Sequence, residues 1–189
     1  MAETIRAFVA VELNDQVKQA IRAFQGHLKP LGCDIAWVKP ENAHLTLKFL
    51  GGVKAKMAPS VAQALMNLCR DLRPFDTTLT QPGIFPNLRH PRVVWIGLDD
   101  TDGNLARLAE SLETALGNIG FKKEKRDFHA HITVGRIRTN KNASQLCEAI
   151  GKFPVPSGVN QSVGQITLFK STLTSHGPVY EPLNQSKIG

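Results

Sequence analysis

The chain has 189 residues, 42% of them hydrophobic, and its 23 Lys and Arg exceed its 16 Asp and Glu to give a formal charge of +7. This length fits one compact unit or two small packed lobes, with enough apolar residues for a core. The positive charge favours polyanionic partners, although it also serves solubility. No secretory signal or membrane-spanning run is present, and three scattered cysteines suit a reducing compartment, so we expect a cytoplasmic protein without membrane contact.

The first part of the chain alternates predicted strands with amphipathic helices. Residues 5–13 form a strand-like run, and Asn14 or Asp15 is placed to cap a helix that ends near Pro30. A short strand at 35–38 and a longer one from His44 come next. A second helix is predicted between the proline pair Pro59 and Pro74, with leucines along one face.

The second part repeats this alternation. Extended segments are predicted at residues 75–85 and 93–98, followed by a helix whose leucine stripe runs from Leu105 to Leu116. A strand begins at His131, a short helix is expected at 141–151, and the tail from Val155 should supply one or two further strands, of which 165–172 is the clearer. Together these elements predict an α+β protein with largely antiparallel sheets.

The tripeptide His-x-Thr occurs twice, each time at the start of a strand-like run. The first copy is in HLTLKFLG, with His44 and Thr46, and the second is in HAHITVGR, with His131 and Thr133. Side chains at positions i and i+2 of a strand lie on the same face, so each copy places an imidazole beside a hydroxyl. A single copy would be weak evidence, but two copies in matching contexts predict one site with both imidazoles.

The residues between the motif positions are expected to face a hydrophobic core. Leu45, Leu47 and Phe49 alternate with the first motif, so regular strand geometry directs them away from the site. Trp37 and Trp95 also lie in apolar runs. We therefore expect these aromatic side chains to be core residues rather than platforms for nucleobases.

The two motifs belong to a longer internal repeat. His131 follows His44 by 87 residues, and the same shift moves the apolar strand 8–11 onto the apolar strand 95–98. It also moves Asp15 onto Asp102, another candidate helix cap. The chain therefore has two halves of similar order, which we expect to form one domain, residues 1–189, of two tightly packed lobes with a motif from each lobe facing a shared cleft.

This set of side chains suits acid–base chemistry on a phosphodiester. One neutral imidazole can accept a proton from water while a protonated one donates to the leaving oxygen, because the ordinary pKa of histidine is about 6.5. The hydroxyls of Thr46 and Thr133 can donate hydrogen bonds to the non-bridging oxygens. Either imidazole could serve as the acid, since the two motifs are equivalent by sequence.

Two basic residues near the motifs are further candidates for phosphate binding. Lys48 is four residues after His44, on the same face of a regular strand, although a solvated lysine would fit the pattern equally well. Arg136 lies at an odd distance from His131, so regular geometry would turn it away from the site. A bulge at Gly135 would redirect the guanidinium, which matches phosphate oxygens well.

Other classes of site lack the residues that they require. The chain has no cluster of ligands at metal spacing beside either motif, no P-loop and no dinucleotide-binding glycine pattern. Aromatic strands of the type found in RNA-recognition modules are also missing. We therefore expect neither a metal nor another cofactor to take part.

The chain resembles the 2H phosphoesterase superfamily, and within it the RNA 2′,3′-cyclic phosphodiesterase branch, also called the 2′-5′ RNA ligase family. The resemblance covers nearly the whole chain, through RAFVAVEL, WVKPENAHLTLKFLG, PRVVWIGL, HAHITVGR and QITLFKSTLTSHGPVYEPL. It implies a bilobal fold with pseudo-two-fold symmetry, in which two sheets line a central cleft and helices lie outside.

The resemblance also implies hydrolysis of an RNA 2′,3′-cyclic phosphate to a 2′-phosphate, without metal and by a monomer acting on RNA ends or cyclic nucleotides. It assigns His44 as proton donor to the leaving 3′ oxygen and His131 as proton acceptor from water. Two alternatives stay open at this point. One is 2′-5′ ligation, the chemical reverse, and the other is a non-catalytic module that binds RNA ends.

Overall fold

The computed structural model describes residues 3–154, 158–175 and 177–189. The strands in these residues are β1 (Thr4–Glu12), β2 (Ile35–Trp37), β3 (His44–Lys54), β4 (Phe75–Phe85), β5 (Val93–Leu98), β6 (His131–Ile137), β7 (Asn160–Val163), β8 (Gln165–Thr174) and β9 (Gly177–Lys187). The helices are α1 (Asp15–Leu28), α2 (Ala58–Arg70), α3 (Asn104–Gly117) and α4 (Ala143–Lys152), with short 3₁₀ turns at Lys29–Leu31, Pro40–Asn42 and Ala55–Met57.

The strands form one curled sheet in the order β7-β4-β5-β6-β3-β1-β8-β9, with β2 also paired to β6. Every pairing is antiparallel, so the predicted α+β class is confirmed. We call β3, β1, β8 and β9 half-sheet I, and β6, β5, β4, β7 and β2 half-sheet II. The two halves join at the centre through a single residue pair, Leu45 with Ile132. Each motif strand therefore lies at the inner edge of its own half-sheet.

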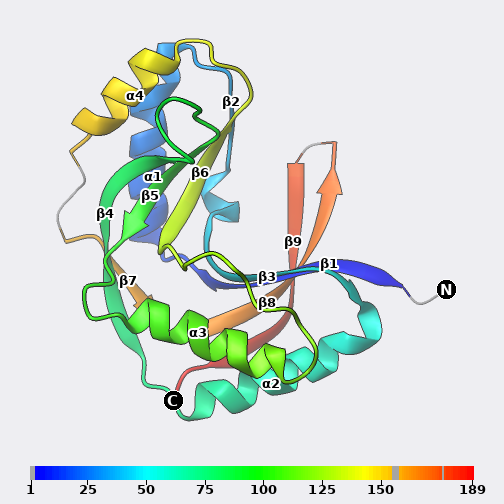
Figure 1. The fold of residues 1–189 in the computed structure, drawn as a ribbon. Coiled ribbons are helices and arrows are strands. Elements are labelled where there is room, and N and C mark those ends of the chain that lie inside the picture. The colour runs from blue at the N-terminus through cyan, green and yellow to red at the C-terminus, as the bar shows by residue number, and fades with distance from the viewer. Residues whose placement is uncertain (1–2, 155–157, 176) are drawn as a thin grey trace.

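Helices α1 and α3 each pack on the half-sheet opposite to the one that contains the preceding strand. Helix α1 follows β1 of half-sheet I but packs near α4 and β7 of half-sheet II, whereas α3 follows β5 of half-sheet II but packs against β3 and α2. Figure 1 shows α1 with α4 on one side of the molecule and α2 with α3 on the other. Each half-sheet is therefore covered by one helix from each copy of the repeat.

The apolar faces of these helices fill a continuous core with the covered face of the sheet. Phe24 of α1, Leu65 of α2 and Leu112 of α3 are fully buried there, together with Leu45 and Ile132 of the central pair. Burial of such side chains stabilises the fold by about 1.5–3 kcal/mol each. Because the core reaches beneath the central pair, the other face of the sheet remains available for the motif side chains.

The last part of the chain contains more strand than the sequence predicts. The predicted tail starts at Val155, which lies outside the described residues, and holds one or two strands, whereas three strands come after residue 158 in the structure. The additional strand is the four-residue β7, which completes half-sheet II by pairing with β4. The sequence of β7, Asn-Gln-Ser-Val, contains one apolar residue and so lacks the apolar–polar alternation that predicts a strand. Within the described residues, no helix is long and apolar enough to cross a lipid bilayer.

Candidate active site

The four motif side chains surround the central pair of the sheet. Because Leu45 pairs with Ile132 in antiparallel register, His44 lies across from Thr133 and Thr46 lies across from His131. All four are partly buried, whereas the central pair points into the core. The two motifs thus form a four-cornered site in which each imidazole has a hydroxyl beside it on its own strand and another across the strands.

Both imidazoles are held by the same backbone contact. Nδ1 of His44 lies 2.9 Å from the carbonyl oxygen of Asn42, and Nδ1 of His131 lies 2.7 Å from the carbonyl oxygen of His129. A carbonyl oxygen only accepts hydrogen bonds, so Nδ1 must carry the proton in each ring. Nε2 is left as the nitrogen that exchanges a proton. No described residue hydrogen-bonds the hydroxyls of Thr46 and Thr133, so both remain available to a ligand.

Aromatic side chains from other strands of the same half-sheet contact each imidazole. The ring of Phe8 in β1 stacks on His44 at 4.6 Å between centroids. In half-sheet II, Phe85 of β4 meets His131 edge to face at 4.9 Å. These contacts fix the ring planes and exclude water from one side of each imidazole.

Burial lowers the pKa of both catalytic candidates. For His44, loss of solvent is the main cause, and the hydrogen bond to Asn42 partly opposes it. For His131, burial is again the largest cause, the hydrogen bond to the His129 carbonyl opposes it, and the charges of His129 and Arg136 lower the pKa further. Both imidazoles therefore favour the neutral form until an anion binds.

A bulge turns Arg136 toward the site. In the pairing of β6 with β5, Thr133 lies opposite Trp95 and Gly135 lies opposite Val94. One residue of β6, between Thr133 and Gly135, therefore has no partner in β5. The alternation then shifts by one, so Arg136 is exposed on the face of Thr133. The structure thus contains the irregularity at Gly135 that the sequence analysis required. Among the described residues, no acidic group forms an ion pair with Arg136.

Lys48 does not lie in the site, and the expectation that it binds phosphate is wrong. In the pairing of β3 with β1, consecutive residues of β1 lie opposite Thr46 and Lys48, so β3 contains one extra residue between them. This bulge shifts the alternation of side chains in β3 also. Lys48 is only 5% exposed. Its Nζ donates to Oε2 of Glu113 in α3 at 2.5 Å and to the carbonyl oxygen of Lys122 at 2.9 Å. Lys48 therefore links β3 to α3 on the covered face of the sheet.

The same bulge brings Phe49 to the open face, which corrects the expectation that it is a core residue. Phe49 is 61% exposed, and its ring lies 6.2 Å from that of Phe8 on the face that carries His44. It follows the first motif as Arg136 follows the second, at the repeat spacing of 87 residues. Sequence reasoning placed a bulge only in the copy with a glycine, but the repeat itself could have predicted both. Trp95 is likewise not in the main core, since it lies 6.3 Å from the ring of His131.

Arg6 is a basic residue of this face that the sequence analysis missed. Burial raises the pKa of the Tyr180 phenol, and the positive charges of Arg136 and Arg6 oppose this shift. Both guanidinium groups therefore act on the same side chain, whose ring meets His44 edge to face at 5.2 Å. The signal was present in β1, where Arg6 shares a strand face with Phe8.

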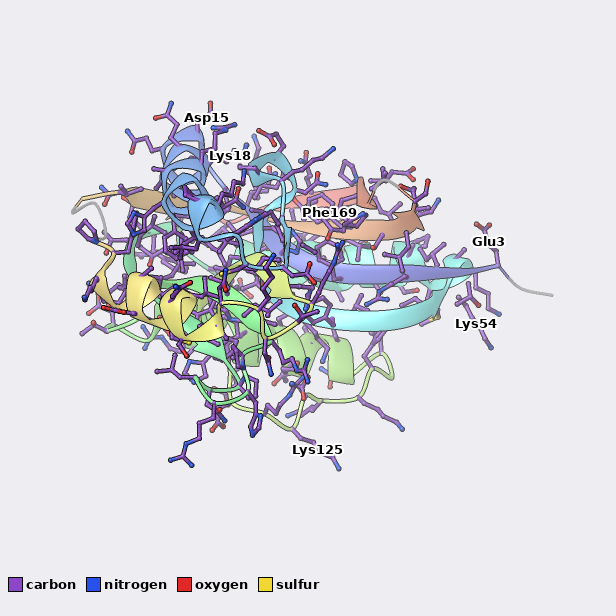
Figure 2. The ribbon with its side chains drawn as sticks, turned by 90° about the horizontal axis from the view of Figure 1, so that it is seen from above. Glu3, Asp15, Lys18, Lys54, Lys125 and Phe169 are labelled. Atoms are coloured by element: carbon purple, nitrogen blue, oxygen red, sulfur yellow. The ribbon has the colours of Figure 1, made fainter. Side chains whose placement is uncertain are left out.

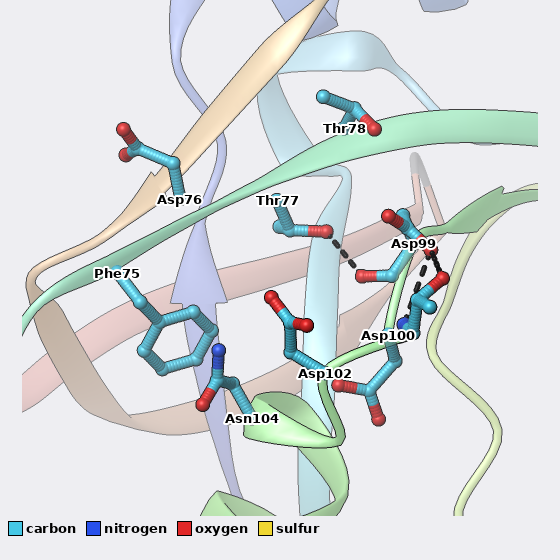
Figure 3. A pocket seen from close by; sticks show the side chains of 9 residues that line it. Phe75, Asp76, Thr77, Thr78, Asp99, Asp100, Asp102 and Asn104 are labelled. Atoms are coloured by element: carbon cyan, nitrogen blue, oxygen red, sulfur yellow. Dashed lines mark hydrogen bonds between the residues drawn. The ribbon is translucent and has the colours of Figure 1, made fainter.

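Two hollows lie on half-sheet II. One, of about 110 Å³, is lined by four aspartates at the ends of β4 and β5, and its charge does not suit an anion (Figure 3). There the Asp100 carboxylate accepts from the backbone N–H groups of Leu105 and Ala106 and so caps α3. The other, of about 450 Å³, lies beside the second motif and is lined by residues that include Gln81, Trp95 and His129.

Comparisons with known proteins agree with this geometry. The profile of a family described as LigT-like phosphoesterase matches the chain twice, over residues 11–95 and 96–180, so each match contains one motif. An RNA 2′,3′-cyclic phosphodiesterase from Methanothermobacter thermautotrophicus is 34% identical over 184 residues, which cover 97% of this chain and 99% of that protein.

Solved structures share the whole fold. A Thermus thermophilus protein superposes with a TM-score of 0.82 at 27% identity, covering 97% of this chain and 98% of that one. The Escherichia coli LigT protein complexed with 3′-AMP gives a TM-score of 0.79, also at 27% identity, with 98% and 99% coverage. These similarities extend over both half-sheets and are not confined to the motifs.

Proposed function

The chain belongs to the LigT-like phosphoesterase family, and we propose that it hydrolyses the 2′,3′-cyclic phosphate at RNA ends to a 2′-phosphate. The observation that carries the proposal is the matched pair of imidazoles, each with Nδ1 bound to a carbonyl and Nε2 free beside two hydroxyls. In this arrangement one imidazole can accept a proton from the attacking water while the other donates a proton to the oxygen that leaves the same phosphorus.

In the proposed reaction, Nε2 of His131 accepts a proton from water as the water oxygen forms its bond to phosphorus. The bond between phosphorus and the 3′ oxygen breaks, and Nε2 of His44 donates its proton to that oxygen. The products are a 2′-phosphate, a neutral His44 and a protonated His131, and exchange with solvent restores the starting state. Thr46, Thr133 and Arg136 stabilise the non-bridging oxygens as negative charge grows on them.

The charges around the two imidazoles support this division of roles. The Arg136 guanidinium lowers the pKa of His131 in addition to burial, which favours the neutral imidazole that a base requires. The pKa of His44 is lowered mainly by burial. A bound phosphate places a negative charge against that ring, so the substrate itself favours the protonated form that an acid requires.

Both intact motifs argue against a module that only binds RNA, since binding would not require two free Nε2 atoms. We further propose a single domain of two lobes that acts as a monomer in the cytoplasm on RNA ends or cyclic nucleotides. The exchange of α1 and α3 between half-sheets supports the single domain, because separation of the lobes would expose both helices.

The experiment is an assay of product position on a short RNA that ends in a 2′,3′-cyclic phosphate. We expect the product to co-migrate with the 2′-phosphate standard. A 3′-phosphate product would contradict the proposed leaving oxygen, and binding without turnover would contradict the enzymatic function. The His44→Ala variant serves as the inactive control.

A further inference from the structure

Half-sheet I carries an exposed aromatic ring and an exposed guanidinium beyond His44. The ring of Phe49 lies 6.2 Å from Phe8, whose own ring stacks on His44, so the three rings form a row that leads away from the reacting groups. Arg6 precedes Phe8 by two residues in β1 and shares its strand face. The row and the guanidinium together define the Phe49–Arg6 surface.

The strand next to this surface leaves room for a ligand. Arg6 pairs across the strands with Gly52, and Gly51 pairs with Ala7. Both glycines are exposed, but only Gly52 is paired on the face of Arg6, and a Cβ there would lie 3.3 Å from the Thr4 methyl carbon. Ala7, the partner of Gly51, is a core residue. Figure 2 shows β1 and β3 running on together past Phe169 to their ends at Glu3 and Lys54. On the face of Arg6, β3 therefore carries no side chain at Gly52, and the guanidinium stays exposed to a ligand.

An exposed phenylalanine in the site is costly to keep in water and has a face that a nucleobase can cover. Without the bulge in β3, the side chain of Phe49 would point into the core. The equivalent position of half-sheet II holds Arg136, which is suited to the phosphate. The two copies thus present different chemistry at one backbone position.

We propose that Phe49 stacks on the base of the nucleotide that carries the cyclic phosphate, and that Arg6 binds the phosphate on its 5′ side. This inference rests on the proposed function and specifies its substrate as the end of an RNA strand. The ribose joins the two, since it carries the cyclic phosphate, the base and the 5′ oxygen. When the cyclic phosphate lies between His44 and His131, the base is directed toward the exposed ring of Phe49. The 5′ phosphate is then directed toward the guanidinium of Arg6.

The first test compares two substrates in each variant: adenosine 2′,3′-cyclic phosphate and the analogue with hydrogen in place of the base at C1′. Wild type should prefer the nucleotide in kcat/KM. In Phe49→Ala this preference should shrink by about 5- to 100-fold, the usual range for loss of one base–aromatic stack. Phe49→Tyr should keep it, and Met66→Ala, which removes an exposed apolar side chain from α2, should leave it unchanged.

The second test adds a 5′ phosphate to the adenosine substrate. Wild type should use the 5′-phosphorylated form more efficiently at low salt, and that gain should disappear in Arg6→Gln. The slope of log kcat/KM against log salt should flatten by about 0.7, as expected for one phosphate contact on a single strand. Arg73→Gln removes an exposed arginine outside the site and should keep the full slope.

The outcomes separate this inference from the proposed function. If wild type hydrolyses no cyclic phosphate, the proposed function fails. If it hydrolyses all three substrates with equal kcat/KM, or if Phe49→Ala and Arg6→Gln keep both preferences, the Phe49–Arg6 surface is not the nucleotide site. Loss of the base preference in Gln81→Ala but not in Phe49→Ala would move the base to the hollow beside Trp95 and overturn the inference.

Discussion

The two half-sheets use one backbone design for two kinds of contact. Each motif strand has the same sequence of partly buried and buried residues up to a bulge, and each bulge turns the fifth residue after the histidine outward. That residue is Phe49 in half-sheet I and Arg136 in half-sheet II. The buried residue at the bulge differs also, since Lys48 forms an ion pair where Gly135 leaves space for Trp37 and Ile35.

The comparison teaches that a repeat can conserve geometry while its chemistry diverges. The positions that must act together on the phosphate, the two His and the two Thr, are the same in both copies. The position five residues after each histidine differs between the copies. In the proposed complex it meets a different part of an asymmetric substrate in each copy. An aromatic ring suits a base, whereas a guanidinium suits the phosphate and lowers the pKa of the nearby His131.

The largest effect should come from the positions that the halves share. His44→Ala and His131→Ala should each lower kcat by about 10²- to 10⁴-fold, because each removes one proton-transfer group. Wild type should show a bell-shaped dependence of kcat/KM on pH, and each variant should lose one limb. The double variant should be little worse than the worse single one. A single variant with near wild-type turnover would remove that histidine from the mechanism.

Arg136→Gln tests the position where the halves differ. Loss of a charged hydrogen bond to phosphate should lower kcat/KM by about 10- to 100-fold. The guanidinium lowers the pKa of His131, so its removal should raise that pKa and move the acidic limb of the pH profile to higher pH. Arg73→Gln is the charge-matched control. An acidic limb that stays in place would show that Arg136 does not act on His131.

Lys48→Met tests the structural role of the residue that pairs with Glu113. The single change leaves a largely buried carboxylate without its partner and should cost about 3 kcal/mol of unfolding free energy in urea. The double variant Lys48→Met with Glu113→Leu should recover most of that loss. Turnover of the double variant should stay within about threefold of wild type. A loss of tenfold or more in the well-folded double variant would show that the ion pair also positions the motif strand for turnover.

The lowered pKa values predict a pH-dependent response to anions. Near the ordinary histidine pKa of about 6.5, the unfolded chain binds more protons than the folded one, so stability falls as pH decreases. Sulfate bound at the site favours the protonated imidazoles and should offset this loss of stability. The rise in Tm on adding sulfate should therefore be larger at pH 6 than at pH 8. In the His44→Gln, His131→Gln double variant the two increases should match. Equal increases in wild type would show that the imidazoles do not meet the anion.

The smallest expected effect is that of metal removal. The sequence has no set of ligands at metal spacing beside either motif, and both halves supply complete imidazole–hydroxyl pairs. Exhaustive treatment with EDTA should therefore leave kcat and KM unchanged. Loss of activity that a divalent ion restores would replace the two-histidine mechanism with a metal-assisted one.

Much of the fold could be predicted because its signals are local. The helices follow from leucine stripes between prolines and caps, and the motif strands follow from alternation over a few residues. The placement of β7 and the exchange of α1 and α3 between half-sheets could not be predicted in this way. Both depend on which distant surfaces are left to cover, and no short window of sequence contains that information.

For the site, the sequence by itself determined the two His-x-Thr pairs and their spacing of 87 residues, because side chains two positions apart in a strand must share a face. Only the tertiary structure decided which way the side chains after each pair point. Hydrogen bonding to β1 and β5 places the bulges, and each bulge reverses the faces of the residues that follow it, in β3 as far as a second register shift between Phe49 and Gly51. For that reason Lys48 lies beneath the sheet, and Phe49 lies on the open face.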